Sequence, residues 1–235
     1  MMLALTTTVA LLVGLVAGTA TRLLLFAWTV PSNAPLRHSC PACDAPVRKA
    51  VRLLALPRGR CAVCRTSWST DCGLPEGMTA LAFALIAASG LTGWIAAAHY
   101  WVATCGTALI LIDAKVHRLP NVLTIPAFAG TTTLLAAASA AGEHGSLSRS
   151  LAAAAALGTA FALMTFGGMG LGDVKLAPTL GALLGWHSWT SVFQGTFTMF
   201  AVGAAVNLIQ GRTRGRIAFG PYMIIGALGV SLCLS

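Results

Sequence analysis

The sequence predicts an all-α polytopic membrane protein with about eight transmembrane helices, and composition is the first evidence for it. Of the 235 residues, 57% are hydrophobic and 9% are charged, and the mean hydropathy is +0.81. An ordinary soluble domain is roughly 45–50% apolar and about 25% charged. The six acidic residues of this chain are too few to cover a water-soluble surface. These values exclude a soluble globular enzyme, a disordered chain and a coiled coil.

The distribution of apolar runs is the second observation. The first run, residues 3–30, is expected to be a retained span rather than a secretory signal peptide, because no Lys or Arg precedes it. Residues 31–77 contain no apolar run of the roughly 20 residues that a span needs. Seven further runs follow, at about residues 78–98, 100–113, 121–141, 150–168, 174–189, 191–210 and 217–234. The chain therefore divides into a first transmembrane helix (1–30), a polar loop (31–77) and a transmembrane core (78–235).

Basic residues give the third observation, the orientation in the membrane. Seven of the fifteen Lys and Arg residues lie within 31–77, which assigns this loop to the cytoplasm and the N-terminus to the outside. When each later apolar run crosses the membrane in the direction opposite to the run before it, thirteen of the fifteen Lys and Arg residues fall on the cytoplasmic side. Because this agreement explains the formal net charge of +9, we expect a lipid membrane as partner and no nucleic acid.

The polar loop carries a metal-binding pattern. Cys40 and Cys43 form one C-x-x-C pair, and Cys61 and Cys64 form a second one seventeen residues later. This spacing is typical of structural zinc sites, in which two turns present four thiolates to one ion. The fold class thus includes a cytoplasmic four-cysteine zinc-binding loop. Reduced cysteines or a redox pair are the alternative.

Two acidic residues stand at span ends. Asp113 closes the run ATCGTALILID, and Asp173 lies in GGMGLGDVKLAPTLG. The alternating direction of the predicted spans brings both residues to the cytoplasmic side at similar depth. Two facing carboxylates can share one proton, so that one acts as a base toward water and the other polarises a carbonyl group. We expect Gly170 and Gly172 to permit unusual backbone angles and the approach of a substrate backbone. As an alternative, each Asp caps or anchors a helix end.

Four stretches, together with the C-x-x-C pairs, resemble the prepilin peptidases, which are membrane aspartic proteases of the GxGD type. Residues 170–176 (GLGDVKL) match the family's second motif, and residues 113–121 (DAKVHRLPN) resemble its first. Residues 219–221 (FGP) resemble the turn before the family's last helix. Residues 74–76 (LPE) are similar to the start of its second span, with Glu76 at the place of the family's Glu. The resemblance covers nearly the whole chain.

The resemblance implies an activity and a place for it. Family members cleave the leader peptides of type IV prepilins or pseudopilins at the cytoplasmic face of the bacterial inner (plasma) membrane. By this resemblance Asp113 and Asp173 form the catalytic pair, one as general base and the other as general acid.

Many family members also methylate the new N-terminus with S-adenosylmethionine, and here the chain departs from the pattern. Bifunctional members carry an aromatic and acidic stretch between the cysteine pairs, whereas residues 44–60 contain no aromatic residue and Asp44 as their only acid. Arg22 stands where those members have Asn. S-adenosylmethionine is therefore expected as a cofactor only if the methyltransferase activity is retained.

Two other classes of function remain open at this point. A transporter or proton channel could use Asp113 and Asp173 as relay groups. A non-catalytic assembly factor could use the cysteine loop as a docking surface. A peptidase differs from both because it should lose cleavage when either Asp becomes Asn.

Overall fold

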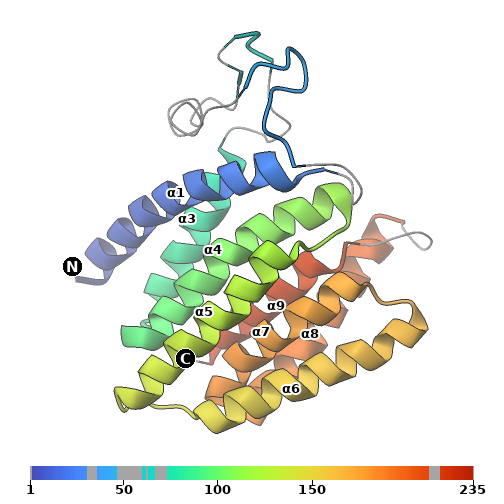
Figure 1. The fold of residues 1–235 in the computed structure, drawn as a ribbon. Coiled ribbons are helices and arrows are strands. Elements are labelled where there is room, and N and C mark those ends of the chain that lie inside the picture. Colours follow the sequence, from blue (N-terminus) through green and yellow to red (C-terminus); the bar gives the residue numbers. More distant parts are fainter. Residues whose placement is uncertain are drawn as a thin grey trace.

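The computed structural model describes residues 2–30, 36–46, 60–61, 63–66, 73–211 and 218–234, and in these ranges it is all-helical with no strand. Figure 1 shows the arrangement. A short 3-10 turn, η2 (Thr165–Gly167), follows one of the helices. The α-helices of the described ranges are α1 (Met2–Trp28), α3 (Leu74–Ala88), α4 (Gly93–Val116), α5 (Asn121–Ala140), α6 (Leu147–Met164), α7 (Leu171–His187), α8 (Trp189–Ile209) and α9 (Gly220–Cys233).

Five of these helices are long and apolar enough to cross a membrane: α1, α4, α5, α6 with η2, and α8. The helices α3, α7 and α9 have 15, 17 and 14 residues. At 1.5 Å per residue they are about 21 to 26 Å long, shorter than the roughly 30 Å of a hydrocarbon core. The described helices thus give a multi-helix membrane architecture, of which five spans meet the criteria of length and composition.

The predicted break between the second and third apolar runs is wrong. It was expected near residue 99, but α3 already begins at Leu74 and ends at Ala88, and α4 begins at Gly93. Gly90, with φ of 83°, lies in the turn between them. Hydropathy does not mark this turn because apolar residues continue on both sides of it, whereas the glycine permits the left-handed backbone. As a consequence, His99 lies inside α4 instead of in a loop.

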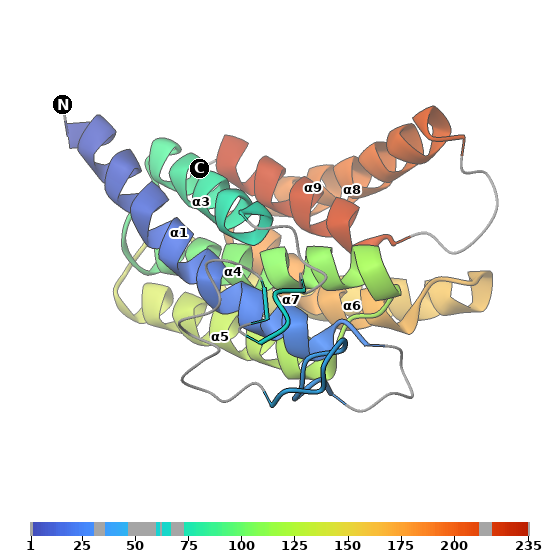
Figure 2. The same ribbon diagram turned by 90° about the horizontal axis from the view of Figure 1, so that it is seen from above.

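Small residues bring neighbouring helices together. The helices pack in pairs, α1 on α3, α4 on α5, α6 on α7 and α8 on α9, and α1 and α6 lie at opposite edges of the bundle (Figures 1 and 2). A Cβ at Gly14 of α1 would lie 2.6 Å from the Cα of Ala80 in α3. One at Gly181 of α7 would lie 2.7 Å from the carbonyl oxygen of Ala153 in α6. Such backbone contact is how membrane helices gain packing energy without a hydrophobic driving force.

A buried ion pair joins α1 to α3. An Arg within an apolar run can either reach the membrane edge or face a polar interior, and the structure shows the second arrangement for Arg22. Its side chain is 3% exposed, and Nη2 lies 2.5 Å from Oε2 of Glu76, which is 12% exposed. The second carboxylate oxygen of Glu76 is buried without a hydrogen-bond partner. The pair thus holds the first turn of α3 against the second half of α1.

Removing one member of this pair should destabilise the fold. We expect Glu76→Leu to lower the free energy of unfolding by about 3 kcal/mol, because it leaves a buried guanidinium without its counter-ion. The double variant Arg22→Met, Glu76→Leu should regain most of that loss, since it removes both charges. Denaturant unfolding in detergent micelles measures the three proteins. A double variant no more stable than Glu76→Leu would contradict the expectation.

Candidate functional site

The structure brings Asp113 and Asp173 together at one end of the bundle. Asp113 lies in the last turn of α4 and Asp173 in the first turn of α7. Their side chains are only 5% and 8% exposed, and the two carboxylates lie close enough to interact electrostatically. Because α4 and α7 are antiparallel, the end of one meets the start of the other. The site therefore combines two buried acids on separate, rigid helices.

The amino end of α9 supplies a hydrogen bond to this pair. The backbone N–H of Gly220 donates to Oδ2 of Asp113 at 3.1 Å. The first N–H groups of a helix have no intrahelical partner and carry partial positive charge, so they stabilise a carboxylate. Asp173 receives similar support from its place in the first turn of α7. Sequence reasoning missed the role of Gly220, because the motif FGP does not say which side chain its backbone meets.

The glycines of the GLGD segment act differently from what the sequence predicts. Gly170 has φ of −68°, an ordinary value, so the expected unusual angle is not found there. The left-handed glycine of this connection is Gly168, with φ of 94°. A Cβ at Gly170 would lie 3.3 Å from Oδ2 of Asp173, and one at Gly172 would lie 3.2 Å from the side chain of Leu119. In this structure the two glycines leave space for neighbouring side chains beside the acids.

The four cysteines of the loop converge at one point. Their sulfur atoms all lie within 4.8 Å of one another. The distances are 3.6 Å from Cys40 to Cys64 and 3.7 Å from Cys43 to Cys61. Four sulfurs at a Zn–S distance of about 2.3 Å in a tetrahedron would be about 3.8 Å apart. The spacing thus fits a tetrahedral metal site, and it is much longer than the roughly 2.05 Å of a disulfide bond.

The two C-x-x-C segments fold into the same turn. In the first, the N–H of Asp44 donates to the carbonyl of Cys40, and in the second the N–H of Arg65 donates to that of Cys61, at 2.9 and 3.0 Å. Asp44 and Arg65 both adopt positive φ, 54° and 56°. Two matched turns of this kind aim two sulfurs each at a shared centre.

The thiols differ in how readily they ionise. Hydrogen bonding to Thr66 lowers the pKa of Cys64 to about 6. For Cys43, a backbone hydrogen bond from Ala45 acts to lower the pKa, but desolvation and the three neighbouring thiols outweigh it and raise the pKa to about 12. Four thiolates this close repel one another, so a cation is what would allow all four to be ionised together.

The cysteine segment is attached to the same end of the bundle as the acids. Cys40 and Cys61 pack on Phe26 in the last turns of α1. Arg118, five residues after Asp113, donates from Nη1 to the carbonyl of Val30 at 3.2 Å. Other parts of the predicted loop, including residues 47–59 and 67–72, and the basic residues 212–216 lie outside the described residues.

Comparisons with known proteins show what this chain is similar to. A model of the type IV leader peptidase family matches residues 100–208, a stretch that includes both acids. A protein of Aeromonas salmonicida named prepilin leader peptidase/N-methyltransferase is 32% identical over 203 residues, which cover 80% of this chain and 68% of that protein.

Proteins of the same name from two other bacteria are also similar. The one from Burkholderia pseudomallei is 32% identical, over 81% of this chain and 65% of its own. The one from Neisseria gonorrhoeae is 29% identical, over 79% of this chain and 67% of its own. No solved structure matches the chain. The family model and the identity to these relatives show that the chain belongs to the type IV leader peptidase family.

Proposed function

We propose that Asp113 and Asp173 are the catalytic pair of an aspartic endopeptidase that removes the leader peptide of type IV prepilins or pseudopilins. The observation that carries the proposal is the convergence of these two buried carboxylates, with the N–H of Gly220 on one of them. Membership of a peptidase family and the names of the relatives support the reaction and the substrate class.

The chemistry follows from the closeness of the pair. Two carboxylates at short range hold one proton between them more readily than they both ionise. The ionised one takes a proton from water, which attacks the carbonyl carbon of the scissile peptide bond, while the protonated one donates a hydrogen bond to the carbonyl oxygen. The proton gained from water then passes to the leaving nitrogen. The pair titrates as a unit, so either Asp can begin as the acid.

We assign the reaction to the cytoplasmic face of a bacterial inner membrane, with the N-terminus of the chain outside. The distribution of Lys and Arg along the sequence supports this orientation. The contact of Arg118 with Val30 supports it as well, because the basic loop begins directly after Val30, at the end of the bundle that holds the acids.

We propose zinc as the ion of the four-cysteine site, held by Cys40, Cys43, Cys61 and Cys64. With four protein ligands such a site has no open position for water, so its role is structural. A short loop has little apolar core, and metal binding would supply the free energy that folds it.

The α1–α3 contact does not fit S-adenosylmethionine. This cofactor carries a cationic sulfonium centre, for which a carboxylate is the natural partner. At this contact the charge of the Glu76 carboxylate is already neutralised by Arg22, which bonds to Oε2. We therefore derive no step through the cofactor, and S-adenosylmethionine remains a cofactor only if the methyltransferase activity is retained.

Removing either carboxylate should abolish cleavage. We expect Asp113→Asn and Asp173→Asn each to lower the rate of leader removal by at least about a hundredfold, since each removes one acid–base partner. Co-expression with a candidate prepilin and mass spectrometry of its N-terminus measure this, and a methylated product would show as a mass increase.

Asp44→Asn, which alters an exposed acid outside the bundle, is the control and should cleave normally. Full cleavage by an Asp113 or Asp173 variant would contradict the proposal. Ion flux through vesicles without any cleavage would favour a relay channel instead.

A methyl group at residue 220 should disturb the site without unfolding the helix. A Cβ there would lie 2.9 Å from Oδ2 of Asp113, so the carboxylate must move. We expect Gly220→Ala to reduce kcat about ten- to a hundredfold, because small displacements of reacting groups are costly. Gly229→Ala in the same helix, where a Cβ meets nothing within 4 Å, should retain activity. Equal activity of the two variants would argue against a role for the Gly220 contact.

Metal analysis tests the cysteine site. Purified protein should carry about one zinc ion per chain, and Cys40→Ser, Cys43→Ser should lose it. Cys233→Ser removes an exposed thiol at the end of α9 and should keep the metal. Elemental analysis of the three proteins gives the answer, and a folded wild-type protein without metal would disprove the assignment.

A further inference from the structure

The helices that hold the acid site meet a second time, through a chain of three polar side chains. His99 of α4, Ser231 of α9 and His187 of α7 are joined by hydrogen bonds of 2.7 Å (His99 Nε2 to Ser231 Oγ) and 3.1 Å (Ser231 Oγ to His187 Nε2). His99 and Ser231 are fully buried, and the centroids of the two imidazole rings are 5.9 Å apart. Sequence spacing alone had not connected these residues.

The partners fix where each proton lies. Nδ1 of His99 is 2.8 Å from the carbonyl oxygen of Ile95, which can only accept, so Nδ1 carries the proton. A neutral imidazole then has Nε2 as an acceptor, and His99 is buried in an apolar bundle where a charge would be costly. Ser231 must therefore donate to His99, and its oxygen accepts from Nε2–H of His187. The chain thus runs in one direction, from His187 through Ser231 to His99.

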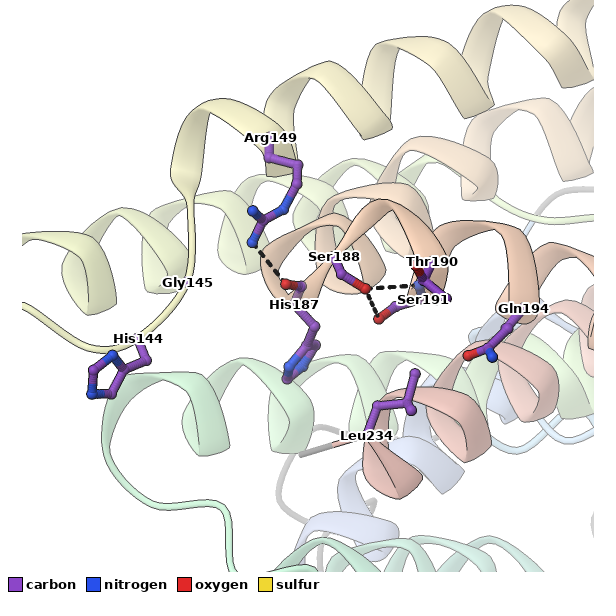
Figure 3. Close-up of a pocket in the computed structure, with 9 residues that line it drawn as sticks. All are labelled: His144, Gly145, Arg149, His187, Ser188, Thr190, Ser191, Gln194 and Leu234. Carbon is purple, nitrogen blue, oxygen red and sulfur yellow. Dashed lines mark hydrogen bonds between the residues drawn. The ribbon is translucent and has the colours of Figure 1, made fainter.

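The far end of α7 is held from its other side as well. Arg149 of α6 donates from Nη2 to the carbonyl oxygens of Trp186 and His187, at 2.6 and 2.8 Å. Figure 3 shows the imidazole of His187 on the side of the α7 terminus away from Arg149. The end of α7 is therefore fixed between α6 on one side and α4 with α9 on the other.

The spacing relates this polar chain to the acids. Fourteen residues separate His99 from Asp113 in α4, and fourteen separate Asp173 from His187 in α7. Fourteen residues make about 3.9 helical turns and about 21 Å, so in each helix the two side chains lie on the same face. In both places α9 bonds to α4, through Gly220 at one end and Ser231 at the other, and at the Ser231 end it also bonds to α7 through His187.

We propose that His99, Ser231 and His187 are positioning residues that set the alignment of Asp113 with Asp173 from the opposite end of the bundle. The inference rests on the proposed role of the two acids. Over 21 Å, a tilt of α7 by about 3° displaces its other end by about 1 Å. A displacement of this size is enough to slow a reaction about a hundredfold. A fixed contact at the far end therefore limits how far the carboxylates can drift apart.

Histidine tautomers test the network without reference to activity. The full-length chain with ¹⁵N-labelled histidine, in detergent micelles, should give NMR signals for a protonated Nδ1 in His99 and a protonated Nε2 in His187. Ser231→Ala should remove the preference of His187 for one tautomer. The opposite tautomers, or a His187 signal unchanged in Ser231→Ala, would overturn the inference and leave the proposed function intact.

Kinetics test the positioning role. We expect His187→Leu to lower kcat for prepilin cleavage about tenfold while KM changes less than twofold, the pattern of a lost contribution to the transition state. His187→Gln, whose amide can donate to Ser231, should recover kcat to within about twofold of wild type. Ser150→Ala is the matched control, because it removes a buried hydrogen bond from α6 to Ala182 of α7 that does not involve α4 or α9.

The outcomes separate the two proposals. Wild-type kcat in His187→Leu, or an equal loss in Ser150→Ala, would overturn the positioning role, while Asp113→Asn and Asp173→Asn still report on catalysis. Full activity of those two Asn variants would overturn the proposed function and the inference with it. Loss of kcat in His187→Leu, recovery in His187→Gln and normal kcat in Ser150→Ala would support the inference.

Discussion

The burial of two carboxylates side by side in an apolar bundle is the constraint on which the rest of the structure depends. An isolated buried charge is very costly, and two like charges in contact are worse. Asp113 and Asp173 are tolerated because helix amino ends supply partial positive charge to them, from α9 to the first and from α7 to the second. At this point three helix ends converge, the end of α4 and the starts of α7 and α9.

Some buried polar groups in this bundle bond within their own helix, and others bond to a neighbouring helix. Buried threonines such as Thr107 and Thr131 return their hydrogen bonds to carbonyls of their own helix, so they satisfy themselves and do not fix one helix against another. In contrast, the bond of Gly220 to Asp113 joins α9 to α4, and the chain through Ser231 joins α4, α9 and α7. A buried polar contact between helices fixes one relative position, whereas apolar packing tolerates small shifts. These contacts fix α9 against α4 at two places and against α7 at one, beside the ion pair between α1 and α3 and the hydrogen bonds from α6 to α7.

The sequence was informative where the signal is local. Composition predicts the membrane class, the cysteine spacing predicts the four-sulfur cluster, and the span ends place Asp113 and Asp173 at matching depth. The sequence does not predict which segments, far apart along the chain, contact one another. The donor from Gly220, the pairing of Arg22 with Glu76 and the contact of His99 with His187 all depend on the arrangement of helices. The hydropathy pattern did not indicate the turn around Gly90 either, because the backbone changes direction there without a change in the polarity of the side chains.

The cysteine site and the acid site differ in the chemistry that they can perform. A centre with four sulfur ligands has no free coordination site, so a metal there cannot activate water. The contacts of the cysteine segment run to Phe26 of α1, and α1 in turn is tied to α3 through Glu76. The helix α1 also contacts α4, and Arg118 bonds to Val30, so the cysteine segment is joined to the end of the bundle that holds the acids. A metal held by the four sulfurs would therefore take no part in the proton transfers that we propose for the two carboxylates.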